Sequence, residues 1–350
     1  MIFLNNVSFL QAFQKPKMWP PTESTDSLEL EYRGLIRENP TLPLRTRANC
    51  MPRVCIIIIY FGNWPVWFSA WLRSCSCNPE FHWLLFTNGD IPTELPRNVE
   101  VEYLSNDELE RQVSEMLGVP FVLSRGYKLV DLKPTYGELF QRYLHDYDFW
   151  GYTDLDVVYG RLANFFTDNR LQNHDVLSPS DRLLVGHLTL IRNTPEFCKL
   201  YRQCPDYLQV LCRDTHEGFD EKGFHRLVMT YSKSGRVRLF LKGMKQEDIL
   251  LRLNGRGHFL IVWHNGRLYD AAVFRQICHF HFMESKWHQE FHVSLISPDT
   301  KLFYITPRTL VPAISVVSQL ILASHVVMCL ASSLPFYLRA VLRRLIPRRP

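Results

Sequence analysis

The sequence lacks several patterns that would assign it at once to a common class of protein. Its formal net charge is only +5, from 40 basic and 35 acidic residues, and arginines near the carboxyl terminus supply much of the excess. The near-neutral remainder argues against a nucleic-acid binder that relies on a broad basic face. No internal repeat or low-complexity segment is visible, and 46% of the 350 residues are hydrophobic. The chain can therefore bury a large core, and we expect no nucleic acid among its partners.

Cysteine is present, but not in a recognisable motif. The nine cysteines are an odd number, and one residue separates Cys75 from Cys77. Zinc and thioredoxin motifs have a two-residue gap, and no second pair follows here. Other cysteines, such as Cys55 and Cys198, stand among apolar residues. We therefore expect buried, reduced thiols in a cytoplasmic protein.

The two ends of the chain bear on membrane association. The first residues, MIFLNNVSFLQAF, have no basic region and no small-residue cleavage site, so no secretory signal is expected. Residues 310–331 contain no charged side chain, but the proline, serines and histidine among them make a bilayer span marginal. The next residues, LPFYLRAVLRRLIPRRP, mix apolar and arginine positions as helices at a membrane surface do. We expect peripheral membrane contact through residues 310–350; a span and a helix packed on the domain are the alternatives.

Between these ends the hydrophobic pattern predicts an α/β domain. Residues 53–62, RVCIIIIYFG, form a β-branched run that is typical of a strand buried on both faces. An amphipathic stretch at 64–75, a second strand at 82–90 and a third strand from Val99 follow. Residues 107–117 are typical of a helix with Asp107 as its N-cap. This alternation predicts a mostly parallel, Rossmann-like sheet flanked by helices.

The chain divides accordingly into three parts. Residues 1–50 are expected to be a loosely ordered lead-in, 51–300 the α/β domain, and 301–350 an apolar and basic helical tail. Ligands of parallel sheets bind beyond the carboxyl ends of the strands. That rule places Tyr60, Phe61 and Asp90 at a binding site.

The segment DYDFWGYTDLDVVYG, residues 146–160, carries the strongest chemical signal. Asp154 and Asp156 stand one residue apart at the end of an apolar and aromatic strand. Burying two uncompensated carboxylates is costly, so a cation or hydrogen-bond donors must satisfy them. Carboxylate oxygens suit Mg²⁺ or Mn²⁺, which keep positions for phosphate oxygens. We predict a metal site here that neutralises charge on a diphosphate leaving group.

A second segment supplies a third metal ligand. In CHFHFMESKW, residues 278–287, histidines and apolar residues alternate as in a strand. An imidazole is a suitable ligand for the same metal, and a nearby lysine can hold a phosphate as a point charge. We assign His281 to the metal and Lys286 to the phosphate, with His279 as a weaker ligand candidate.

Together these motifs resemble the GT-A glycosyltransferases, most closely the uncharacterised capsular-polysaccharide type related to the glycogenin-like family. The resemblance covers roughly residues 53–287. It rests on an ordered set of segments: IIYFGNWPVWFSAWLRSC, YKLVDLKPTYG, FWGYTDLDVVYG, GHLTLIRNT, FDEKGF, IVWHNGRLY and HFMESKW. The glycogenin-like site ends in His-x-Gly-x-x-Lys, which His281 and Lys286 match. Met283 replaces the glycine, so the backbone cannot approach a phosphate there as glycine permits.

The resemblance implies a GT-A fold with an Asp-x-Asp motif and a specific activity. That activity is sugar transfer from a nucleotide-diphosphate donor, expected to be a UDP-sugar, to a hydroxyl of a glycan or lipid-linked acceptor in polysaccharide or glycoconjugate synthesis. Mn²⁺ or Mg²⁺ would be the cofactor, held by Asp154, Asp156 and His281. The donor-binding residues would be Tyr60, Phe61, Asp90, Lys133 and Lys286, with Asp131 as a further candidate. The catalytic candidates are His187, near the transferred sugar or the acceptor, and Asp220 or Glu221, against the sugar hydroxyls.

Stereochemistry and two other functions stay open at this point. Similarity to the glycogenin-like enzymes implies retention, whereas an inverting reaction would need Asp220 or Glu221 as its base. Asp154 and Asp156 also fit the nucleophile strand of a haloacid-dehalogenase-like phosphatase, although that strand usually opens its domain. An inactive glycan-binding or scaffold protein is the other alternative. Purely structural roles for the three catalytic candidates are also compatible with the sequence.

Two aromatic features are interpreted as structural. Trp64, Trp67 and Trp71 recur at helical spacing, which favours packing of one helix face over a sugar-stacking platform. Trp263 precedes Asn265-Gly266, which predicts a hairpin turn.

Overall fold

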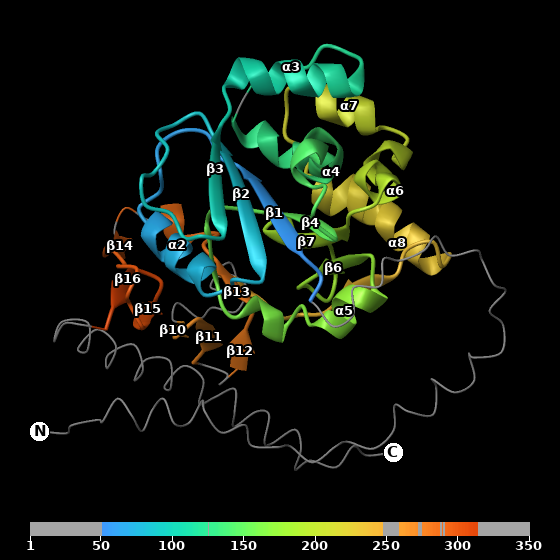
Figure 1. Ribbon diagram of the computed structural model, residues 1–350. Coiled ribbons are helices and arrows are strands. Elements are labelled where there is room, and N and C mark those ends of the chain that lie inside the picture. Colours follow the sequence, from blue (N-terminus) through green and yellow to red (C-terminus); the bar gives the residue numbers. More distant parts are fainter. Residues whose placement is uncertain are drawn as a thin grey trace, which may run out of the picture. The chain divides into compact units, whose positions relative to one another are not determined.

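The computed structural model describes residues 51–124, 126–247, 259–271, 275–287, 289 and 291–313 (Figure 1). The predicted lead-in, residues 1–50, and residues 314–350 of the predicted tail lie outside these described residues. Among the described residues, no helix has the length and apolarity needed to cross a membrane. Membrane contact through the tail stays a prediction.

A seven-stranded sheet forms the centre of the described domain, in the order β3-β2-β1-β4-β7-β6-β8. Neighbouring strands are parallel except at β7, which runs antiparallel to both β4 and β6. This confirms the predicted mixed α/β domain with a mostly parallel sheet. The strands are β1 (Val54–Ile59), β2 (Phe81–Thr87), β3 (Val99–Tyr103), β4 (Phe149–Thr153), β6 (Val176–Ser178), β7 (Leu188–Arg192) and β8 (Leu239–Leu241).

Helices cover both faces of this sheet, as Figure 1 shows. Alternate residues of β1 point to opposite apolar layers. Ile57 lies in the core cluster that also contains residues of α3, α4, α6, α7 and α8. Ile56 lies in the cluster that also contains residues of α2 and α5. The helices are α2 (Phe68–Ser76), α3 (Asn106–Leu117), α4 (Tyr136–Leu139), α5 (Asp168–Asn173), α6 (Pro195–Cys198), α7 (Tyr207–Cys212) and α8 (His225–Lys233). The other helical segments are η1 (Gly126–Thr135), η2 (Gln141–Tyr143), η3 (Leu162–Asn164), η4 (Leu200–Gln203), η5 (Asp220–Phe224, a π-turn that continues into α8) and η6 (Ser285–Trp287).

Two smaller sheets complete the described domain. One has the order β5-β13-β9, with β5 (Val157–Tyr159), β13 (His279–His281) and β9 (Gln246–Glu247). The other has the order β12-β11-β10-β15-β16-β14. Its strands are β10 (Ile261–His264), β11 (Arg267–Asp270), β12 (Arg275–Ile277), β14 (His292–Val293), β15 (Leu302–Ile305) and β16 (Thr309–Pro312).

The strands β15 and β16 correct the predicted start of the tail at residue 301. Phe303, Ile305 and Leu310 are fully buried, in a core cluster that also contains Trp263 and Ala70 of α2. Removing that apolar surface from water stabilises the sheet, so residues 301–313 extend the folded domain and do not begin a separate tail.

Most predicted elements are present, with small shifts at their ends. Helix α2 begins at Phe68, after a turn in which Phe68 N–H donates to the carbonyl of Pro65 at 2.9 Å. The N-cap of α3 is Ser105, whose side chain accepts from the N–H of Glu108, and the prediction of Asp107 is wrong. Ser105 has the extended backbone that an N-cap needs, whereas Asp107 lies in the first turn.

The predicted hairpin after Trp263 is confirmed. Strands β10 and β11 pair antiparallel, with Asn265 at φ 48° and Gly266 at φ 79° between them. Positive φ at both central positions is the property for which Asn-Gly is selected in such turns. The seven cysteines among the described residues are all free, and most of them are buried.

Candidate metal and donor site

The two aspartates lie in a tightly held turn between β4 and β5. Thr153 Oγ1, at the end of β4, donates to the carbonyl of His187 at 2.7 Å. The carbonyl of Leu155 accepts from Trp67 Nε1 at 3.0 Å, and the Leu155 side chain is buried. These contacts fix Asp154 and Asp156 at the carboxyl end of β4. In the strand order, successive strands β1, β2 and β3 extend to one side of β1, and β4 lies on its other side. Open α/β sheets bind ligands at such a switch in strand order.

Strand β13 brings a histidine to the same place. It pairs antiparallel with β5, so that His281 lies opposite Val157, and the N–H of Phe282 donates to the carbonyl of Asp156 at 2.8 Å. His281 Nε2 lies 3.3 Å from an Asp156 carboxylate oxygen. One ligand atom from each of Asp154, Asp156 and His281 lies within 4.8 Å of the others. The structure therefore assembles the predicted ligand set, and two carboxylates with one imidazole suit Mn²⁺ or Mg²⁺.

Each aspartate has a lysine partner. Lys133 Nζ lies 2.5 Å from Asp154 Oδ1 and donates to the carbonyl of Gly186 at 2.9 Å. Lys286 Nζ donates to Asp156 Oδ2. Burial opposes the charge of Lys133, but Asp154 and Asp220 raise its pKa above the ordinary value. Burial likewise opposes the charge of Asp156, but His281 and Lys286 hold its pKa below the ordinary carboxyl range. Lys133 and Asp156 are thus charged at neutral pH.

Asp220 is an unsatisfied carboxyl group beside this cluster. It is 1% exposed, and neither of its carboxylate oxygens has a hydrogen-bond partner. Burial raises its pKa to about 7, with Lys133 opposing the shift and Glu221 and Asp154 adding to it. A Cβ atom at Gly186 would lie 2.5 Å from Asp220 Oδ2 and 3.2 Å from Lys133 Nζ. Gly186, which sequence reasoning missed, is therefore required for this close approach.

Glu221, the other predicted carboxyl group, is less buried than Asp220. Its side chain is exposed, and its Oε1 accepts from the N–H of Gly186 at 2.9 Å. Glu221 thus helps to hold the turn before β7, whose residue Gly186 also lies against Lys133 and Asp220.

Asp131, a further donor-binding candidate, has a structural place instead. It is fully buried and accepts from Lys128 Nζ and from the backbone N–H groups of Glu217 and Phe219, each at 2.9 Å. These bonds hold the loop that leads into Asp220. A carboxylate with so many partners has little capacity left for a ligand.

The predicted catalytic residue His187 lies in a buried group of histidines. Its Nδ1 is 2.7 Å from Nε2 of His279, and its ring centroid is 4.2 Å from that of His281. His279 Nδ1 is in turn 3.1 Å from the sulfur of Cys278. The structure thus packs His187 and His279 around the candidate metal ligand His281. The sequence did not indicate the contact of His187 with β13, because His187 precedes β7 and lies far from β13 in the chain.

The three residues predicted to bind the nucleotide, Tyr60, Phe61 and Asp90, have different surroundings in the structure. Burial raises the pKa of the Tyr60 hydroxyl, with the charge of Asp156 adding to the effect and Lys286 opposing it, so this side chain faces the cluster. Phe61 packs against the apolar layer that contains Ile57. Asp90 is exposed, and its main-chain carbonyl accepts from Trp64 Nε1 at 2.9 Å. Of these three residues, Tyr60 is the one whose pKa reports the charge of Asp156.

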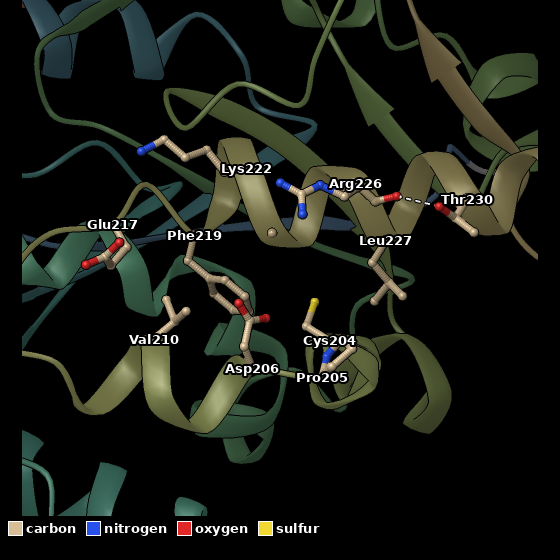
Figure 2. A pocket seen from close by; sticks show the side chains of 11 residues that line it. Cys204, Pro205, Asp206, Val210, Glu217, Phe219, Lys222, Arg226, Leu227 and Thr230 are labelled. Atoms are coloured by element: carbon tan, nitrogen blue, oxygen red, sulfur yellow. Dashed lines mark hydrogen bonds between the residues drawn. The ribbon is translucent and has the colours of Figure 1, made fainter.

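A cavity of about 330 Å³ lies beside η5 (Figure 2). Phe219, Lys222 and Gly223 from η5 and its approach line it, together with Arg226 from α8 and Asp206 at the start of α7. Asp220, in the same turn, is not among its lining residues. The candidate metal cluster and this cavity are therefore separate features that share the η5 turn.

The fold and the site together define a mixed α/β protein with an Asp-Asp-His candidate cation site at the carboxyl edge of a mostly parallel sheet. The model of a family of unknown function, DUF6625, matches residues 56–313, and the chain belongs to that family. No curated protein sequence matches the chain. Among solved structures, that of the galactosyltransferase LgtC in complex with donor and acceptor sugar analogues aligns with 67% of this chain and 90% of that chain, at 11% identity and a TM-score of 0.38.

Proposed function

We propose that this protein is a metal-dependent glycosyltransferase that uses a nucleotide-diphosphate sugar, with a UDP-sugar as the expected donor. The observation that carries the proposal is the cluster of Asp154, Asp156 and His281, whose ligand atoms lie within 4.8 Å at the switch point of the sheet. Mn²⁺ and Mg²⁺ accept such ligands and retain positions for diphosphate oxygens. Lys133 and Lys286 reach the same carboxylates, so ammonium groups are at hand for the phosphates.

The neighbouring residues fit sugar transfer. The bound cation would supply charge to stabilise the departing nucleoside diphosphate. The buried oxygens of Asp220 lack partners, and hydroxyl groups of the transferred sugar would satisfy them. Asp220 or Glu221 would assist attack by a hydroxyl of a glycan or lipid-linked acceptor. His187 packs on His281 and would hold the orientation of that ligand.

The rival phosphatase reading fits the structure less well. Its nucleophile strand usually opens the domain, but β1, β2 and β3 precede β4 in the chain. Its metal site also needs a downstream pair of acidic residues. Within the described residues, the third potential ligand of the cluster is His281, which is an imidazole donor.

The test is a donor screen on the full chain. Melting temperature and donor hydrolysis would be measured with common nucleotide sugars, with and without Mn²⁺. The wild type is compared with the double variant Asp154→Asn, Asp156→Asn and with the control Asp146→Asn, an exposed acid in the same segment. We expect one donor to stabilise the wild type only with Mn²⁺, and hydrolysis to fall by at least about a hundredfold in the double variant because the charge-stabilising ion is lost.

Each alternative has its own outcome. Turnover of a generic phosphate ester without any turnover of nucleotide sugars would establish the phosphatase. A folded protein that binds glycans but responds to no donor or metal would be a binding or scaffold protein, and the proposal would be wrong.

A further inference from the structure

We propose that Lys133 and Lys286 act against the bare cation, so that this site binds the divalent cation far more tightly together with the donor diphosphate, as one metal–nucleotide complex, than alone. The inference rests on the proposed function in one respect, namely that the anionic ligand of the site is a nucleotide diphosphate. It adds a specific role for the two lysines, which is to compete with the cation for the same carboxylates.

The competition follows from the contacts. Lys133 Nζ touches Asp154 Oδ1, and Lys286 Nζ touches Asp156 Oδ2. A cation bound by both aspartates needs an oxygen from each, in a cluster whose ligand atoms already lie within 4.8 Å. A divalent ion placed there stands within a few ångströms of both ammonium groups.

The lysines cannot both move away into water. The Lys133 side chain is 4% exposed, and its Nζ is also held by the carbonyl of Gly186 at 2.9 Å. The Lys286 side chain is 20% exposed, on the short turn η6 that follows β13. Lys286 therefore has some freedom to swing, whereas Lys133 has almost none.

A count of charges shows which ligand the site favours. The two aspartates and the two lysines neutralise one another, so a bare divalent cation adds two positive charges without compensation. Even a fully ionised Asp220 offsets only one of them. Repulsion between like charges at such short range is strong in a largely buried site. A nucleotide sugar carries one negative charge on each of its two phosphates, so the complex with the cation adds no net charge.

The diphosphate also replaces the contacts that the lysines give up. When the cation takes the carboxylate oxygens, the phosphate oxygens become acceptors for both ammonium groups. Cation and nucleotide must then raise each other's affinity by the same factor, because coupling between two ligands is reciprocal.

The experiment measures Mn²⁺ affinity of the full chain by electron paramagnetic resonance of the free ion, with and without saturating UDP. The variants are Lys133→Met and Lys286→Met, which keep much of the side-chain length and remove the charge. Lys199→Met is the matched control, since Lys199 is an exposed lysine that pairs with Glu138 outside the site. Circular dichroism checks folding, and the more exposed Lys286 keeps the test valid if Lys133→Met does not fold.

For the wild type, we expect weak binding of Mn²⁺ alone and a rise of roughly 30-fold or more with UDP, within the usual range of coupling between ligands. In Lys286→Met and Lys133→Met, binding of Mn²⁺ alone should tighten by about tenfold, UDP should bind more weakly, and the coupling should shrink. Lys199→Met should match the wild type.

Unchanged or weaker binding of Mn²⁺ alone in both lysine variants would overturn the inference while leaving the metal-dependent transferase intact. A second negative result would be that the wild type binds no Mn²⁺ even with UDP, so that it cannot be told apart from Asp154→Asn. That result would remove the proposed function as well as the inference.

Discussion

Two lysine–aspartate pairs that begin in the same turn, η1, have different surroundings. In the first pair, Lys128 and Asp131 are both fully buried, and Lys128 Nζ also donates to the carbonyls of Val210 and Thr215 at 2.6 and 3.1 Å. In the second pair, Lys133 is buried but Asp154 is 30% exposed, at the open edge of the sheet.

The difference separates a structural pair from a functional one. In the first pair every lysine hydrogen has an acceptor, and Asp131 accepts from backbone N–H groups as well. A buried ion pair is tolerated only when such bonds satisfy it. In the second pair, Asp154 keeps contact with solvent and sits among potential ligands of a cation. Partial exposure of one partner therefore marks the pair that can exchange its contacts with a ligand.

The largest effect is expected from breaking the first pair. Lys128→Met leaves Asp131 buried without its counter-charge, and we expect a loss of about 3–5 kcal/mol in the free energy of unfolding. Lys133→Met, the matched change five positions on, leaves an aspartate that water can reach and one carbonyl, that of Gly186, without its donor, so we expect a smaller loss of about 1–2 kcal/mol. Urea unfolding of both variants tests the contrast. Equal losses would show that exposure of the aspartate does not distinguish the pairs.

A smaller effect is expected from Asp220, which belongs to neither pair. Its pKa of about 7 lies above the ordinary value, so the folded state holds this proton more tightly than the unfolded chain. The group therefore lowers stability as pH rises from the ordinary carboxyl pKa towards 7. Asp220→Asn should unfold like the wild type at pH 4 and be more stable at pH 8, by up to about 4 kcal/mol.

The measurement is urea unfolding of both proteins across that pH range. A constant difference between them at all pH values would contradict the assignment of an elevated pKa to Asp220. Donor hydrolysis by the same variant should fall even though the protein is more stable, since the proposed sugar contacts are weakened.

The smallest effect on the free energy of unfolding is expected at His216, the partly exposed neighbour of the first pair. His216 Nδ1 lies 3.2 Å from Asp131 Oδ1, but its side chain is 28% exposed. His216→Gln should cost less than about 1 kcal/mol, because solvent compensates for the lost contact. Thermal unfolding checks this value. A loss as large as that of Lys128→Met would mean that the buried pair depends on its exposed neighbour.

The features that could be predicted from the sequence are those encoded within a few neighbouring residues. The strand at β1, the helix at α3 and the Asn265-Gly266 hairpin follow from hydrophobic period and turn chemistry within a few residues. Asp154, Asp156 and His281 were predicted because carboxylates and histidines at strand ends have few structural uses. Residues 301–313 were misassigned, since a short apolar strand and the start of an apolar tail have the same local pattern.

By itself, the sequence determined the alternating elements and the residue types of the candidate site, because periodicity and side-chain chemistry are properties of short segments. The tertiary structure alone decided which charges meet. It paired Lys133 with Asp154 and Lys286 with Asp156, packed His187 on His281, and brought Asp220 against Gly186. These partners are at least 21 residues apart in the chain, and only the packing of strands and turns against one another sets their distances.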